Sequence, residues 1–215
     1  MERLVCLLIG YACGLFQTAY LLGRLCHIDI REKGSGNVGT TNALRVLGWK
    51  AGLITFLCDV LKCIAAIIIT RVIFRNSAYL PLLAMYAGVG VTLGHNFPFY
   101  MKFKGGKGIA VLAGLIAVTM VYTSLWVGMI PLVIFVTAVV LTRYISVGSL
   151  QVSAMFLMVV IFYGQLGDFG MEKQYLYELY GLVFFLTVLA WYRHRENIRR
   201  LINGTENRFG SKAKR

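Results

Sequence analysis

Residues 34–48, GSGNVGTTNALRVLG, have the residue types of an anion-binding turn. Three glycines in the first six positions allow backbone amides to point into one small cavity, and TTNALRVL predicts a short helix that Gly48 ends. The side chains supply hydroxyl, amide and guanidinium donors, on Ser35, Thr41, Asn42 and Arg45. The alternative is a solvated loop with glycines for tight turns. Because Arg45 follows Thr41 by one helical turn, we expect a phosphate site.

The same glycines have the G-x-G-x-x-G spacing of a dinucleotide-binding turn, with an acid, Asp59, twenty residues further on. That turn requires a buried strand before it. The preceding residues 27–33, HIDIREK, form a polar linker instead, and Asp59 lies inside an apolar segment. A dinucleotide site is therefore excluded.

The second stretch is KFKGGKG, residues 102–108, in which two glycines between Lys104 and Lys107 predict exposed amides beside two ammonium groups. It lacks the spacing and the magnesium-binding hydroxyl of a P-loop. Positive charge at the cytoplasmic membrane face explains the lysines equally well, but the glycine pair favours phosphate binding. His95 and Asn96 end the preceding apolar segment, where a histidine is more often a cap than a catalyst.

The third stretch is YRHRENIRRLINGTENRFG, residues 192–210. His194 and Asn197 are three residues apart and share one helix face, and Glu196 and Arg200 have the spacing of an i, i+4 ion pair. His194 is a catalytic residue or a histidine at the membrane interface. Ser146 opens a later apolar segment and donates to the same anion or caps its helix.

Asp59 and Lys62 lie within the second apolar segment. Unpaired at mid-bilayer, each costs about 2.5–3.5 kcal/mol. Their spacing predicts a local ion pair, and a role in shaping the floor of the site is the alternative.

The elements that position these residues are membrane helices. The chain is 58% hydrophobic and only 14% charged, which leaves too few polar side chains to cover a soluble domain. Backbone groups in lipid must be satisfied within their own segment, so we predict an all-α polytopic protein with about seven transmembrane helices. The apolar segments are 4–23, 51–74, 78–95, 108–122, 124–142, 145–164 and 176–192. The fourth is short and is tilted or re-entrant, and five spans are the alternative.

Most lysines and arginines fall on one side of this arrangement, including those of the tail, Lys212, Lys214 and Arg215. The positive-inside rule then places the N-terminus outside and the C-terminus in the cytoplasm. All three polar stretches would lie on the cytoplasmic face, so we expect the active site there. We predict one integral-membrane domain, 1–215, without a metal site, because its five cysteines show no metal spacing.

Three motifs in register, GSGNVGTTNALR, GHNFPFYMKFKGGKG and YRHRENIRRLINGTE, closely resemble those of the bacterial acyl-phosphate:glycerol-3-phosphate acyltransferases, the PlsY family. RYISVGSL, residues 143–150, is similar to another family stretch. Departures are small: Thr40 stands where the family often has Ala, and Val111 where Thr is common.

The resemblance implies acyl transfer from acyl phosphate to the 1-hydroxyl of glycerol-3-phosphate, which gives lysophosphatidate and inorganic phosphate and is the first committed step of bacterial phospholipid biosynthesis. It implies that His194 and Asn197 position the glycerol hydroxyls, with either His194 or a substrate phosphate oxygen as the base. The phosphate-binding residues it implies are Ser35, Thr41, Asn42, Arg45, Lys104, Gly105, Gly106 and Lys107, to which we add Ser146.

We accordingly expect a multi-pass monomer of the bacterial cytoplasmic membrane. Its substrates would be glycerol-3-phosphate and long-chain acyl phosphate, and it would contact membrane lipid. We expect it to need no cofactor and to bind no nucleic acid. A transporter of organic phosphates should show internal repeats, which the sequence lacks. A phosphotransferase of the CDP-alcohol type needs clustered aspartates for magnesium, and the nine acids here are scattered.

Overall fold

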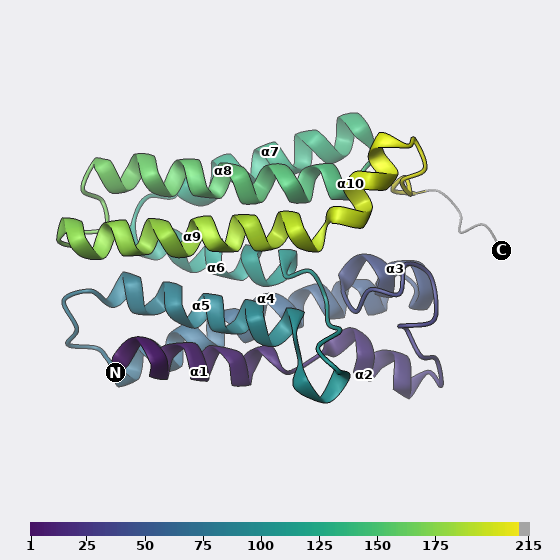
Figure 1. The fold of residues 1–215 in the computed structure, drawn as a ribbon, viewed down its shortest axis with the longest axis horizontal. Coiled ribbons are helices and arrows are strands. Elements are labelled where there is room, and N and C mark those ends of the chain that lie inside the picture. Colours follow the sequence, from purple (N-terminus) through teal and green to yellow (C-terminus); the bar gives the residue numbers. More distant parts are fainter. Residues whose placement is uncertain (211–215) are drawn as a thin grey trace. The chain divides into compact units, whose positions relative to one another are not determined.

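The computed structural model describes residues 1–210, which are helical or irregular and contain no strand (Figure 1). Lys212, Lys214 and Arg215 of the predicted basic tail lie outside the described residues. The helices are α1 Glu2–Gly14, α2 Thr18–Leu25, α3 Thr40–Leu47, α4 Trp49–Ile73, α5 Leu80–Asn96, the 3₁₀ helix η1 Phe99–Met101, α6 Ile109–Tyr122, α7 Trp126–Thr142, α8 Ile145–Gln165, α9 Lys173–Arg193 and α10 Arg195–Ile202.

The chain divides into two compact units, unit 1 from Met1 to Leu115 and unit 2 from Ile116 onward. The boundary falls within α6. The single domain over 1–215 therefore stays a prediction, and each unit is described by itself.

Each of the seven predicted apolar segments is helical over most of its length. Four helical stretches within the described residues have the length and hydropathy to cross a membrane: Glu2–Leu25, Trp49–Ile73, Ile145–Gln165 and Lys173–Arg193. Helices α5, α6 and α7 are shorter, with 17, 14 and 17 residues. The number of crossings and their orientation remain predictions.

The first apolar segment differs from the expected single helix, because α1 ends at Gly14 and α2 begins only at Thr18. A break frees backbone carbonyls that need partners in an apolar environment. Lys62 Nζ donates to the Phe16 carbonyl at 2.8 Å, and Tyr100 Oη donates to that of Leu15 at 2.7 Å. Buried Gln17 donates to the carbonyl of His95 at 3.0 Å. Partners distant in the sequence thus stabilise the break.

In unit 1, α1 packs lengthwise on α5 (Figure 1). Gly10 and Gly14 on α1 face Gly90 and Gly94 on α5, and a Cβ added at any of them would stand 2.0–2.3 Å from a backbone oxygen of the other helix. Small residues spaced four apart on both helices permit this close approach. The approach holds the end of α5 beside the break in the first segment.

In unit 2, α8 packs against both α7 and α9, and α10 follows α9 after a turn at His194 (Figure 1). Helix α7 contains Pro131. Gly164 on α8 leaves room for the Tyr180 side chain of α9, whose hydroxyl would lie 2.2 Å from an added Cβ. This packing places the start of α8 and the end of α9 for the contacts described below.

Candidate active site

The first loop, residues 26–48, contains the predicted short helix near its end. Helix α3 spans Thr40–Leu47 and stops at Gly48, whose φ of +92° suits glycine. Gly39 precedes the helix and supplies no side-chain cap. The first amides of α3 have no intrahelical acceptor, and the N-terminus of a helix favours anions. The local geometry therefore retains the features from which a phosphate site was predicted.

Asn42 has a different role from the expected phosphate ligand. It is buried, its Nδ2 donates to the carbonyls of Ile30 at 3.1 Å and Lys33 at 3.0 Å, and its Oδ1 accepts the Ser35 amide at 2.9 Å. Both N–H donors are used, so none remains for a phosphate. Gly34, at φ +62°, allows this approach, because an added Cβ would lie 2.2 Å from Asn42 Oδ1. Asn42 therefore stabilises the conformation of the loop through hydrogen bonds to the loop backbone.

Arg31 differs from two other cations of unit 1 in having an ion-pair partner. Arg31 pairs with Asp29 at 2.6 Å, and the hydrogen bonds from Arg31 lower the pKa of Asp29 to about 2. That arginine is thus neutralised locally at neutral pH. Arg45 is half-buried and Lys104 is exposed, and neither side chain forms an ion pair with any residue in 1–210. These two cations fit the role of phosphate ligands.

The glycine pair of the second loop also differs from expectation. The amides of Gly105 and Gly106 donate to the carbonyls of Asn96 at 3.0 Å and His95 at 3.1 Å, so they satisfy the end of α5 and are not presented to an anion. A Cβ on Gly106 would stand 2.1 Å from His95 Nε2 and 2.7 Å from the Val38 carbonyl oxygen. The glycines are needed because the two loops and α5 meet here.

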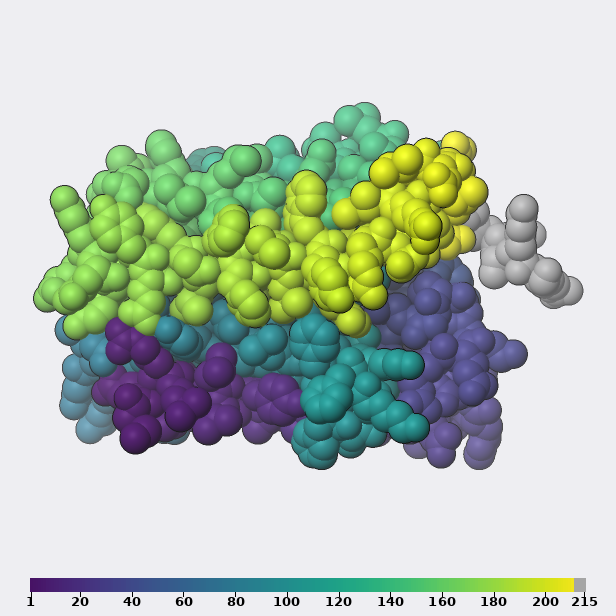
Figure 2. Space-filling view, in the orientation of Figure 1, coloured from purple at the N-terminus to yellow at the C-terminus, as the bar shows by residue number. Residues whose placement is uncertain are grey.

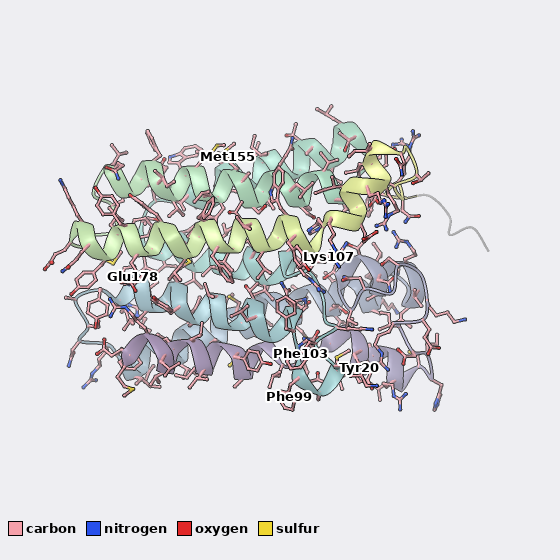
Figure 3. All side chains as sticks on the ribbon, in the orientation of Figure 1. Tyr20, Phe99, Phe103, Lys107, Met155 and Glu178 are labelled. Atoms are coloured by element: carbon pink, nitrogen blue, oxygen red, sulfur yellow. The ribbon has the colours of Figure 1, made fainter. Side chains whose placement is uncertain are left out.

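A small apolar core holds the two loops together. Its buried members are Ala19, Ile30, Val38, Ala43 and Met101, with Tyr20 and Leu47 packed against them. Figure 2 shows the second loop, in teal, beside the indigo surface of α2 and the first loop. Lys107, labelled in Figure 3, extends from the second loop just before α6. The predicted convergence of the first two stretches is confirmed within unit 1.

The predicted ion pair within α4 is present, with Lys62 Nζ 2.7 Å from Asp59 Oδ1. It includes a third member, because His95 Nδ1 lies 2.9 Å from Lys62 Nζ and 3.6 Å from Asp59 Oδ1. His95 is buried in this cluster, so its ring does not act as a simple helix cap. Asn96, beside it, is fully buried.

In unit 2, His194 joins α9 to α10 and is 3% exposed. Its Nδ1 lies 2.7 Å from the carbonyl oxygen of Ala190. A carbonyl only accepts, which assigns a proton to Nδ1. In the neutral ring Nε2 is then able to accept a hydrogen bond from a hydroxyl, which suits either role predicted for His194.

Glu206 organises the rest of the third stretch and was missed by the sequence analysis. Its Oε1 accepts from Asn197 Nδ2 at 2.7 Å and Ser146 Oγ at 3.1 Å, and its Oε2 accepts from Arg200 Nε at 2.7 Å. The predicted pair of Arg200 with Glu196 was therefore wrong: Arg200 instead contacts the carboxylate six residues ahead. The available signal was that Glu206 is one of only two acids, with Glu196, in a strongly basic segment.

These features define an integral membrane protein whose loops carry groups suited to phosphate. The glycerol-3-phosphate acyltransferase family model matches residues 4–204, and the chain belongs to that family, as the motifs predicted. The glycerol-3-phosphate acyltransferase of Thermoanaerobacter pseudethanolicus is 40% identical over 214 residues, 99% of this chain and 98% of that protein. The Clostridioides difficile protein of the same name is 39% identical over 212 residues, 95% and 94% of the two chains.

Two solved structures are similar to this chain along most of its length. The crystal structure of PlsY, an integral membrane glycerol 3-phosphate acyltransferase, in its glycerol 3-phosphate form has a TM-score of 0.83 at 29% identity, and the match covers 98% of this chain and 96% of that one. The lysophosphatidic acid form of PlsY has a TM-score of 0.80 at 28% identity, with the same coverage. The chain is therefore an integral membrane protein of the PlsY type.

Proposed function

We propose that this protein transfers the acyl group of a long-chain acyl phosphate to the 1-hydroxyl of glycerol-3-phosphate, giving 1-acyl-glycerol-3-phosphate and inorganic phosphate. The similar crystal structures were obtained in glycerol 3-phosphate and lysophosphatidic acid forms, the acceptor and product of such a transfer. The donor is inferred from the three motifs. The sequence also has no H-x-x-x-x-D acyltransferase signature after His27, His95 or His194.

One observation carries the proposal. Two loops more than sixty residues apart in the sequence meet at Gly106 and Val38 in unit 1, and they carry Arg45 and Lys104, cations without an ion pair in residues 1–210. Cations held on ordered loops suit a phosphate better than a neutral substrate. Ser35 and Thr41 add hydroxyls to the same loop, and Lys107 a further ammonium.

The chemistry needs little activation, because an acyl phosphate is a mixed anhydride. The 1-hydroxyl oxygen attacks the acyl carbon, the bond from that carbon to the phosphate oxygen breaks, and phosphate leaves with the bonding electrons. Arg45 and Lys104 stabilise the negative charge that develops there, and alignment of the hydroxyl supplies much of the acceleration. His194 and Asn197 orient the glycerol hydroxyls. The hydroxyl proton passes to a phosphate oxygen of a substrate.

The membrane setting belongs to the same proposal. The chain crosses the bacterial cytoplasmic membrane about seven times as a monomer, with its N-terminus outside and its active site on the cytoplasmic face. The basic loops support this orientation.

The decisive experiment uses pure, detergent-solubilised protein and glycerol-3-phosphate. Palmitoyl phosphate and palmitoyl-CoA are supplied in separate reactions, and lysophosphatidate and released phosphate are followed. We expect product with palmitoyl phosphate alone. Product only with the CoA ester would refute the donor, and no product with either would refute the reaction.

A further inference from the structure

The buried cluster beneath the second loop has a defined hydrogen-bond polarity. Lys62 Nζ lies 2.7 Å from Asp59 Oδ1, 2.8 Å from the Phe16 carbonyl and 2.9 Å from His95 Nδ1. An ammonium group has three N–H donors and no acceptor. The ammonium therefore hydrogen-bonds to the Phe16 carbonyl and to His95 Nδ1, with Asp59 Oδ1 as its ion-pair partner. Because an ammonium can only donate, His95 Nδ1 is an acceptor and the imidazole proton lies on Nε2.

The opposite side of the His95 ring faces the junction of the two loops. The Cβ that Gly106 lacks would stand 2.1 Å from His95 Nε2 and 2.7 Å from the Val38 carbonyl oxygen. The carbonyl of His95 accepts the Gly106 amide at 3.1 Å. His95 thus contacts the second loop through its ring and its backbone, at the point where the first loop arrives.

The cluster is closed on its other sides. Asp59 is 1% exposed, His95 4% and Lys62 8%. Gln17, at the break between α1 and α2, donates to the His95 carbonyl at 3.0 Å and to that of Gly94 at 3.4 Å. Lys62, Asp59 and Gln17, the partners of His95 named above, all belong to unit 1.

We propose that Asp59, Lys62 and His95 are positioning residues for the phosphate-binding loops. Asp59 orients the Lys62 ammonium, the ammonium holds His95 as its neutral Nε2–H tautomer, and that N–H supports the junction at Gly106 and Val38. This inference rests on the proposed function, because that function assigns phosphate binding to the loops that carry Arg45 and Lys104. We expect the buried ion pair to specify one arrangement of its neighbours.

The first test reads the tautomer directly and needs no activity. The chain has three histidines, so ¹⁵N-histidine NMR of the wild-type protein in micelles at pH 7.5 gives three ring spin systems. His27→Gln and His194→Gln assign them. We expect His95 to carry its proton on Nε2, and His194, bonded through Nδ1 to Ala190, to show the opposite tautomer. A proton on His95 Nδ1, an imidazolium or a mixture of tautomers would overturn the proposal.

The second test compares two variants that differ in which ring nitrogen they imitate. His95→Gln places an amide near Nε2 and keeps its donor, whereas His95→Asn reaches only the position of Nδ1. We expect the KM for glycerol-3-phosphate to rise about tenfold in His95→Asn and by less than about threefold in His95→Gln, with similar kcat in both. Equal effects of the two substitutions would overturn the positioning role. An inactive wild type would refute the proposed function, while the NMR result would still decide the tautomer.

Discussion

Replacing Glu206 by Gln tests whether one buried carboxylate organises the third motif. In the wild type, Oε1 accepts from Ser146 and Asn197, and Oε2 accepts from Arg200. Glutamine retains one oxygen for the first two bonds. Its NH₂ group would then face the Arg200 Nε–H, which sets donor against donor. We expect the variant to lose the hydrogen bond between Arg200 and residue 206, and to hold the Asn197 side chain less firmly.

The magnitude follows from burial. A hydrogen bond to a charged group contributes about 1.5–3 kcal/mol, and breaking a fully buried ion pair costs about 3–5 kcal/mol. The Glu206 side chain is 6% exposed, but that of Arg200 is 34% exposed, so water replaces part of the lost interaction. We therefore expect a loss of about 2–3 kcal/mol in the free energy of unfolding. For a chain of this length, that corresponds to a Tm lower by about 4–12 °C.

The assay is thermal unfolding of detergent-solubilised wild type, Glu206→Gln, Arg200→Gln and the double variant. The double-mutant cycle should give a coupling of about 1–3 kcal/mol. Glu196→Gln is the matched control, because the Glu196 side chain is 62% exposed and 4.0 Å from Arg195. It should leave Tm nearly unchanged. Additive effects of the first two substitutions, or a Glu206→Gln shift no larger than that of the control, would refute the reasoning.

Three further predictions concern catalysis and packing. Arg45→Ala and Lys104→Ala should each remove most of the acylation of glycerol-3-phosphate while Tm and membrane insertion stay normal; wild-type turnover in either purified variant contradicts the phosphate-site assignment. His194→Gln keeps hydrogen bonding without a titratable base, so we expect kcat within about tenfold of wild type; a loss as complete as that of His194→Ala would identify His194 as the base. Gly94→Leu should lower Tm strongly, because an added Cβ would stand 2.3 Å from the Tyr11 carbonyl oxygen. Gly181→Leu is the control, because an added Cβ there would have nothing within 4 Å. Equal Tm shifts in the two variants would show that the α1–α5 contact is not tight.

Much of the helical architecture was predictable from local pattern. Apolar runs long enough for lipid become helices because each backbone group must find its partner nearby. The predicted bounds of α4, α8 and α9 agree with the structure to within three residues. The bounds of α3 were also predictable, since Gly48 ends the run TTNALRVL. Such signals lie within one helical turn of the residues they control.

The break between α1 and α2 was not predictable in this way. Hydropathy over residues 4–23 indicates one continuous span, and the carbonyls freed at Leu15 and Phe16 are satisfied by Tyr100 and Lys62, which are far away in the chain. The prediction that the glycine pair of the second loop exposes its amides to an anion was wrong for the same reason. Its amides had two possible acceptors, a bound anion or the end of α5, and only folding places the carbonyls of α5 beside them.

The sequence by itself determined the membrane class, the helical segments and, through three motifs in order, the acyltransferase family. Tertiary structure decided what the buried polar side chains do. Asn42 hydrogen-bonds to the backbone of its own loop, and His95 contacts the Asp59–Lys62 ion pair. Glu206 accepts hydrogen bonds from Asn197 and Arg200 of the third motif. A buried polar group must be hydrogen-bonded, but most of its possible partners are distant in sequence. Residue type and spacing therefore identify the donors and acceptors, whereas only the packing of helices decides which of them meet.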